Sequence, residues 1–339
     1  MRKLLLVIFL MAGLLAALVG WALNSTWLTV YLARRQLPGL LPEAVVTSLS
    51  ARQQRFRWPG DLAWDDVRLG IKYKGRECHV MVSRLTVTGL QALLGDQAAL
   101  VVKASDAGID FPPGKADGLD TELSVLFQSR HFVSAEGPVT VSRMSWDKLL
   151  VRQVAFKLRK DIGGTALSDI RAEAYNGILL GDLKVAPSGT EYSADFTAEG
   201  VDTVRLAEWN EQVADKLRGL AGGRVRFAGK ADTLSSLEGE FAMSAGTEVS
   251  SSLLAVLLEV LPQLPDRKRL EALIRKGGQF PVELLTMTIR SDDPRHCGGE
   301  LRLRSRKANL AINLTPDINT DGTWPSLFNI GKDWLNRGR

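Results

Sequence analysis

Apolar and polar residues alternate along most of the chain from about residue 62 onward, which is the period of β-strands that bury one face and solvate the other. The segment LRLR at 301–304 alternates leucine with arginine, and LAINL at 310–314 repeats the alternation after a short turn. The same period occurs at 67–73, 153–159, 192–197, 224–227, 240–244 and 285–290. The pattern predicts a mostly β protein built from antiparallel sheet.

Glycine pairs punctuate this pattern at 163–164, 222–223, 277–278 and 298–299. Each pair stands just before a predicted strand, where the positive φ that glycine tolerates is often required. The segment YNGILLG at 175–181 places an Asn-Gly pair between two strand-like runs, which is a strong local signal for a β-hairpin.

Few segments show the helical period. One helix is predicted over 202–219, two short ones over 251–278, where Pro262 and Pro265 interrupt the pattern, and a single turn at 89–95. The segment from 251 to the first proline is apolar nearly all round, so it must be buried or touch lipid. It is too short to cross a bilayer, and we expect it to cap one end of the sheet.

This supply of helix is small for so much one-sided sheet. About 14 strands spaced at ~4.8 Å would make a sheet ~65 Å long, and three short helices can shield only part of one face. The sheet must therefore fold over on itself, hold something apolar, or do both.

The N-terminus carries a different pattern. Arg2 and Lys3 precede an uncharged apolar run, Leu4 to Leu23, which at ~1.5 Å per residue spans ~30 Å, the thickness of a bilayer core. The run is long for the apolar region of a cleaved signal peptide, so we expect an uncleaved single-pass anchor, with the signal peptide as the alternative. Because arginines flank both sides of the run, the lysine and arginine distribution does not decide its orientation.

The 339 residues, 45% of them hydrophobic, suffice for a large core, and the net charge of +5 suits an anionic membrane surface. No nucleic-acid-binding motif is present, so we expect no nucleic-acid partner. Cys78 and Cys297 each stand beside a histidine, but adjacent residues on a strand point to opposite faces, which disfavours a metal site. The two cysteines predict either one disulfide or two unpaired buried thiols.

The second half resembles the AsmA-like family of envelope proteins, which includes the TamB-type bridges. The resemblance is carried by AEAYNGILLGDLKVAPSGTEYSADFTAEGVDTVRLAEW, by LRGLAGGRVRFAGKADTLSSLEGEFAMSAGTEVSSSLLAVL, and by ANLAINLTPDINTDG at 308–322. The resemblance covers roughly residues 165–322 and, in addition, the N-terminal anchor. Asn176 stands where the family usually has glycine.

The resemblance implies a fold and a place in the cell. We expect an N-terminal transmembrane helix followed by a long curved antiparallel sheet, a taco-like β-groove with a few short helices and an apolar lining. The bulk of the chain would lie in the periplasm, anchored in the inner membrane. Residues 1–33 would be the anchor, 34–61 a linker, 62–200 the N-terminal part of the groove, 201–322 its AsmA-like C-terminal part with capping helices, and 323–339 a tail.

Two functions follow as hypotheses. The first is a lipid-handling protein that takes part in phospholipid transport or envelope biogenesis, because larger family members are linked to phospholipid movement. The second is a structural or assembly component of an envelope or secretion complex, with a closed β-sandwich in which two apolar faces cover each other. Membrane lipids would be the partner in the first case and envelope proteins in the second.

For the lipid-handling hypothesis, the predicted acyl-chain contacts are the apolar residues of the alternating C-terminal strands: Val225, Phe227, Phe241, Met243, Leu285, Met287, Ile289, Leu301, Leu303, Leu310, Ile312 and Leu314. The arginine stripe Arg302, Arg304 and Arg306 is a candidate for anionic headgroups, with an ordinary solvated face as the alternative. We find no catalytic motif, and the paired carboxylates at 65–66 and 292–293 fit solvated turns, so we expect no enzyme activity, cofactor or metal.

Overall fold

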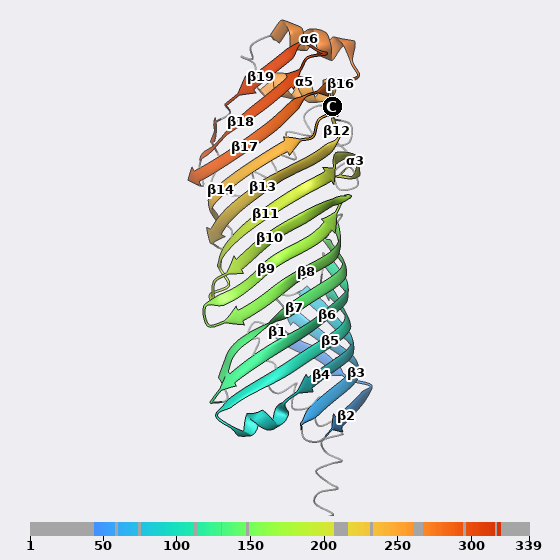
Figure 1. Cartoon of the computed structure of the whole chain (residues 1–339), viewed down its shortest axis with the longest axis vertical. Helices are drawn as coiled ribbons and strands as arrows, with labels where there is room; N and C mark the ends of the chain where they lie inside the picture. The colour runs from blue at the N-terminus through green and yellow to red at the C-terminus, as the bar shows by residue number, and fades with distance from the viewer. Residues whose placement is uncertain are drawn as a thin grey trace, which may run out of the picture. The chain divides into compact units, whose positions relative to one another are not determined.

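The computed structural model describes residues 44–57, 60–73, 76–111, 114–129, 131–146, 149–206, 216–230, 233–260, 267–293, 296–315 and 317–319. The predicted anchor and the predicted tail lie outside these ranges. The chain is mostly β and divides into two compact units, Met1–Asp147 and Lys148–Arg339 (Figure 1). This boundary falls between two strands and does not coincide with the division at residue 200 that the sequence suggests.

Unit 1 is an antiparallel sheet. Its described elements are β1 (Ala44–Ser50), β2 (Gln53–Arg57), β3 (Asp61–Tyr73), β4 (Arg76–Thr88), the 3-10 helix η1 (Leu90–Leu94), β5 (Gln97–Phe111), β6 (Gly114–Gln128) and β7 (His131–Trp146). From β3 to β7 each strand pairs with the next one along the chain, while β1 and β2 pair with the two ends of β3. In Figure 1 this sheet curls so that β1 passes behind β6 and β7.

The linker predicted over residues 34–61 is wrong for residues 44–57, which form β1 and β2. Arginine and glutamine obscure the alternation there, but the partners show it: Phe56 pairs with Leu62, and Val46 pairs with Ile71. The structure also corrects the turn predicted at Asp65-Asp66. Both residues lie inside β3, where Asp66 has a positive φ of 51°.

Unit 2 contains a longer antiparallel sheet. Its described strands are β8 (Leu149–Asp161), β9 (Gly164–Ala174), β10 (Gly177–Val185), β11 (Glu191–Asp202), β13 (Leu220–Lys230), β14 (Thr233–Met243), β17 (Leu284–Asp293), β18 (His296–Ser305), β19 (Leu310–Leu314) and β20 (Asp317–Asn319). They pair in that order, and β19 and β20 pair with opposite ends of β18. A small second sheet joins β12 (Leu217–Arg218), β15 (Thr247–Ser250) and β16 (Gln279–Val282).

The turns of unit 2 confirm part of the glycine pattern. Tyr175 and Asn176 both have positive φ, 50° and 64°, and close the β9–β10 hairpin that the Asn-Gly pair predicts. The pair at 277–278 also lies in a turn with positive φ. The pairs at 222–223 and 298–299, predicted as turns, instead lie inside β13 and β18. At Gly223 and Gly299 the backbone of the neighbouring strand leaves no room for a side chain.

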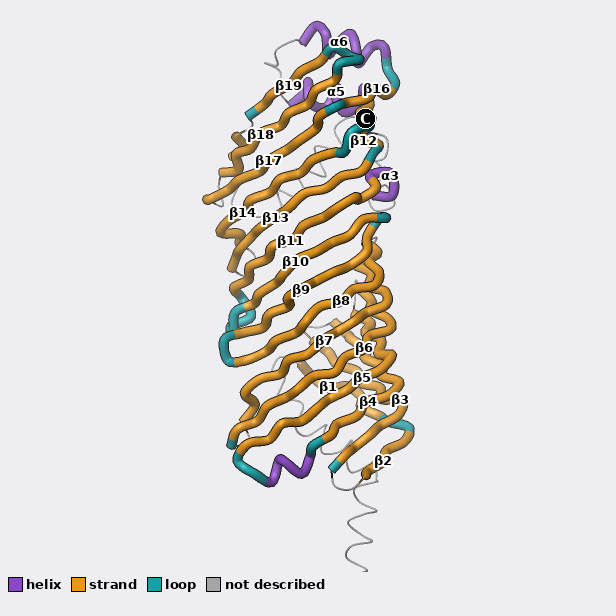
Figure 2. Tube along the Cα trace, in the orientation of Figure 1, coloured by secondary structure: helices purple, strands orange, loops and turns teal. Residues whose placement is uncertain are grey.

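The helices of unit 2 are α3 (Thr203–Leu206), α5 (Ser251–Val260) and α6 (Arg267–Lys276). The two predicted helices over 251–278 are therefore confirmed, as is the turn at 89–95, which is η1. Of the helix predicted over 202–219, the start is confirmed as α3, residues 207–215 lie outside the described ranges, and Leu217 belongs to a strand. Figure 2 shows α5 and α6 gathered beside β18 and β19 at the C-terminal end of the sheet.

We call α5, α6 and the small sheet the cap. Its core is a cluster of buried apolar side chains contributed by the cap and by β18 and β19: Val249, Leu253, Leu254, Leu270, Val282, Leu303, Leu310, Ile312 and Leu314. Leu254 and Leu270, one from each helix, are fully buried. The cap therefore closes one end of the sheet by ordinary hydrophobic packing.

Candidate functional site: an apolar sheet face

The strand register of unit 2 places all twelve predicted lipid contacts on one face of the sheet. Paired residues in an antiparallel ladder point to the same side. Met287 pairs with Phe241 on one side and with Leu301 on the other, and Leu301 in turn pairs with Leu314. The neighbouring rows carry the remaining residues on that side. We call this surface the apolar face of unit 2.

The twelve residues differ sharply in burial. Leu303, Leu310, Ile312 and Leu314 are buried in the core of the cap, so they are removed from any surface that a ligand could reach. Leu285 and Leu301 are half-buried against the same core. The candidate surface therefore begins beyond the cap.

Beyond the residues that pack against the cap, the apolar face is exposed to solvent. Phe241 remains 40% exposed and Met287 38% exposed. The remaining four residues on this part of the face are half-buried: Val225, Phe227, Met243 and Ile289. Phe241 and Met287 are paired neighbours, so their exposed apolar surface is contiguous.

Phenylalanine rings lie close against glycines on this face. A Cβ built on Gly223 would lie 2.9 Å from Cδ1 of Phe241, and one built on Gly239 would lie 3.3 Å from Cε2 of the same ring. The ring of Phe196 occupies the corresponding position over Gly181 on β10. These rings therefore occupy the space that a side chain at the glycine would fill, and they cover the backbone there.

The face also includes residues that were not among the predicted contacts. Phe196 pairs with Val225, and Ala194 pairs with Phe227, so β11 extends the same surface. The ring of Phe227 stacks on Phe196 at 6.5 Å between centroids and meets Tyr192 edge-on at 6.3 Å. The alternation at 192–197 was the signal that could have added these residues, since it has the same period as the neighbouring strands.

Unit 1 has an apolar face of its own. One row of paired residues crosses five strands, from β3 to β7: Val67, Val82, Ala107, Leu119 and Val141. A parallel row contains half-buried side chains that include Leu69, Val80 and Ile109. Gln54 of β2 is buried, and its Oε1 accepts a hydrogen bond of 3.1 Å from Nε1 of Trp64.

The opposite face of the unit 2 sheet is polar and contains ion pairs. Nε and Nη2 of Arg224 donate to the two carboxylate oxygens of Asp195 at 2.7 and 2.5 Å, and Arg226 donates to the same carboxylate at 3.1 Å. The hydrogen bond from Arg224 holds the pKa of Asp195 below its ordinary value, against the opposing effect of desolvation, and Arg226 adds to the lowering. This face has the chemistry of a solvated surface.

The three arginines proposed for headgroups do not border the apolar lining. Arg302 and Arg304 lie on the polar face, because they alternate along β18 with Leu301 and Leu303. Arg302 is bound to both carboxylate oxygens of Glu300 at 2.8 Å, which also lowers the pKa of Glu300. Arg306 lies in the β18–β19 turn. A lipid lying on the apolar face cannot place its headgroup on Arg302 or Arg304 through the sheet.

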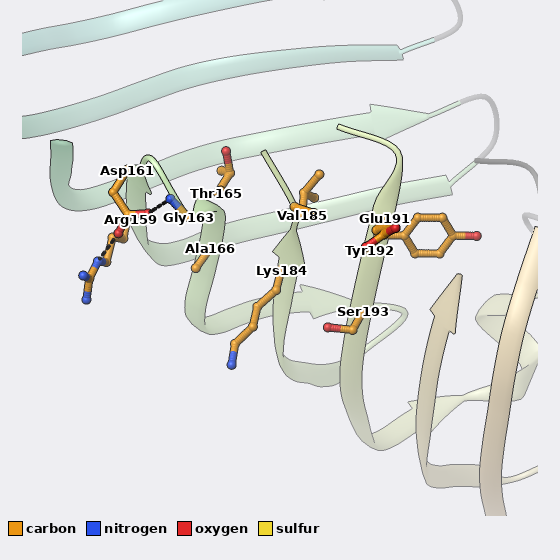
Figure 3. Close-up of a pocket in the computed structure, with 12 residues that line it drawn as sticks. Arg159, Asp161, Gly163, Thr165, Ala166, Lys184, Val185, Glu191, Tyr192 and Ser193 are labelled. Carbon is orange, nitrogen blue, oxygen red and sulfur yellow. Dashed lines mark hydrogen bonds and ion pairs between the residues drawn. The ribbon is translucent and has the colours of Figure 1, made fainter. Parts of the chain in front are cut away.

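Polar groups meet the apolar face at another place, around the ends of β8 to β11. A hollow of about 520 Å³ is bordered there by both sides of the sheet. Figure 3 shows Arg159 and Lys184 extending to one side, and Thr165 and Val185 to the other. Arg159 is paired with Asp161 at 3.0 Å.

Other candidate chemistry does not assemble among the described residues. Cys78 and Cys297 are free thiols, Cys297 buried and Cys78 half-buried, and burial followed by the charge of Asp110 raises the pKa of Cys78. Within the described ranges no three His, Cys, Asp or Glu side chains gather as a metal site, and no helix has the length and apolar character needed to cross a membrane. Comparisons with protein-family models, curated proteins and solved structures found no match.

Proposed function

We propose that this chain binds lipid acyl chains on its apolar sheet faces, as an inner-membrane-anchored periplasmic protein that takes part in phospholipid transport or envelope biogenesis. The observation that supports the proposal best is the exposure of Phe241 and Met287 on a face whose other end is closed by the cap. The same surface is thus covered by protein at one end, and over part of its length the described residues leave it exposed.

Acyl chains fit the chemistry of this face. Removing apolar surface from water contributes ~25 cal/mol per Å², or ~0.8 kcal/mol for each buried CH₂ group. An apolar face of aromatic, aliphatic and small residues offers contact along an acyl chain without requiring any directional bond. The open part of the face would hold acyl chains through Phe241, Met287 and Ile289, joined by Val225, Phe227 and Met243, while Leu285 and Leu301 border the cap.

The headgroup would remain outside the apolar face. The polar face carries paired charges on the far side of the sheet, so it does not serve as a headgroup site for a chain bound on the apolar face. The proposed binding is therefore selective for acyl chains more than for the headgroup, and lipids with different headgroups should compete for it.

Native mass spectrometry tests the proposal. The full-length protein, extracted in mild detergent, should carry phospholipid masses that persist when the detergent is removed in the gas phase. A preparation that is monodisperse and free of lipid would contradict it.

An assembly component is the second candidate. The observation that favours it is the cap itself, where Leu303 and its neighbours show that protein can close this face completely. An envelope protein could cover the open part in the same way. A stoichiometric protein partner recovered from native membranes, with no bound lipid, would favour this function over the first.

A further inference from the structure

The positive charge of this protein is concentrated at the cap. Helix α6 has five cations and one glutamate within ten residues, RKRLEALIRK. The end of β18 and the following turn, residues 304–307, add three cations and no acid. These two segments carry net charges of +4 and +3, whereas the whole chain has a net charge of +5, so the remainder of the chain is net negative.

Both segments adjoin the core of the cap. Leu270 of α6 is fully buried in the core of the cap, and Ala308 of the turn packs against the same core. Figure 1 shows α6 beside the end of β18 and the start of β19. Arg306 and Lys307 precede Ala308 directly in this turn, where the backbone N–H of Arg306 donates to Oε2 of Glu283 at 2.8 Å. We call α6 together with residues 304–307 the basic end.

The cations of α6 point away from the protein. Leu270, Leu273 and Ile274 lie on one side of the helix and pack against the core. Lys268 and Lys276 lie on the opposite side and are exposed, as the helical period requires. The apolar side is thus already used inside the protein, and the helix offers only its charged side to a partner.

Several cations of the basic end lack an ion-pair partner among the described residues. Some cations on the polar faces of the sheets are paired, as Lys230 is with Glu191 at 2.8 Å and Lys157 with Asp169 at 2.9 Å. In α6, Arg267 pairs with Glu271 at 2.9 Å. Lys268, Arg269 and Lys276 make no ion pair within the described part of the chain, so their field is not cancelled locally.

We propose that the basic end docks the C-terminal end of unit 2 on an anionic bilayer surface. Charge complementarity is the argument: several unpaired cations face outward together, and a surface of anionic headgroups attracts each nearby lysine or arginine independently of its precise position. Because no apolar side chain of α6 is free to insert, the contact is electrostatic and weakens steeply with salt. This docking does not depend on lipid binding by the apolar face.

Capture of vesicles tests the docking. The full-length protein is reconstituted in nanodiscs of phosphatidylcholine and mixed with vesicles of either phosphatidylcholine alone or phosphatidylcholine with phosphatidylglycerol. We expect capture of the anionic vesicles only, lost when the salt concentration is raised to about 0.5 M, where the Debye length is short.

A matched pair of variants locates the contact. The variant Lys268→Gln/Arg269→Gln/Lys276→Gln removes three unpaired cations and should bind the anionic vesicles roughly 100-fold more weakly. The variant Lys103→Gln/Lys115→Gln/Lys157→Gln removes three exposed cations that are paired elsewhere, changes the net charge equally, and should bind as the wild type does. Circular dichroism establishes that both variants remain folded.

Three outcomes would overturn the proposal. Equal loss of capture in the two variants would show that net charge alone matters, and equal capture of neutral vesicles would show that the contact is not electrostatic. Tighter binding of a duplex oligonucleotide than of the anionic vesicles, through the same three cations, would assign the basic end to nucleic acid instead.

Discussion

Phe241 and Met287 face each other across strands β14 and β17, and each keeps about two fifths of its side chain exposed, 40% and 38%. Only one residue further along the same row, Leu301 packs against the core of the cap. The boundary between covered and open apolar surface therefore falls between neighbouring strands of one sheet. The proposed function is that lipid acyl chains cover the open side of this boundary.

A charge placed at this boundary should remove bound lipid. Met287→Arg puts a cation on the apolar face, where an acyl chain would have to desolvate it, which is costly without a partner. We expect the amount of co-purified phospholipid to fall at least several-fold, measured by lipid mass spectrometry against protein concentration.

The matched control is Met81→Arg. Met81 is 51% exposed and pairs with Arg68 and Gly108 on the polar face of unit 1. The chemical change is identical, but it lies away from any apolar face, so bound lipid should be unchanged. Equal loss of lipid in both variants would attribute the effect to charge or folding and not to the apolar face.

Core and open residues should differ in their contribution to stability. Leu254 is fully buried in the cap, so Leu254→Ala should lower the free energy of unfolding by about 3–5 kcal/mol. Met287→Ala should cost only about 1 kcal/mol, because much of its side chain is in water already. Urea unfolding followed by circular dichroism measures both. Similar losses of unfolding free energy in the two variants would mean that the apolar face near Met287 is packed as tightly as the cap.

The ion pairs of the polar face predict a pH dependence. The pKa of Asp195 is lowered in the folded state, so its contribution to stability is fully present above the ordinary aspartate pKa of about 3.9 and is lost as the pH falls through the lowered value. Because these groups are partly exposed, we expect Asp195→Asn to cost only about 0.5–1 kcal/mol at pH 7. The difference in unfolding free energy between wild type and variant should be constant from pH 7 to 5 and shrink below pH 4.

Asp96→Asn is the control for that titration. The Asp96 carboxylate makes no ion pair in the described part of the structure. The substitution should therefore change the free energy of unfolding little, both between pH 7 and 5 and below pH 4. A difference for Asp195→Asn that grows as the pH falls would contradict the assigned role of Arg224.

The alternation in sequence predicted which residues share a face, because a strand has a period of two regardless of its surroundings. Leu301 and Phe241 lie on one side for this local reason. It also implied that Arg302 lies on the other side from Leu301, so the poor placement of the arginines for headgroup binding was already present in the sequence.

The alternation could not predict which residues of the apolar face are covered by other segments of the chain. Leu303 and Met287 have equivalent places in the alternation, and only the packing of α5 and α6, far away in sequence, buries one and leaves the other exposed. The same holds for Gly223, which looks like a turn residue locally but lies in a strand beneath the ring of Phe241. Contacts between distant segments decide both cases.

Photocrosslinking at residue 241 tests the central claim most directly. A photoreactive phenylalanine analogue replaces Phe241 in the full-length protein within native membranes, and a second protein carries it at Met81. We predict a phospholipid adduct, detected by mass spectrometry, at position 241 and none at position 81. A protein adduct in place of lipid at position 241, or equal lipid labelling at both positions, would contradict the account.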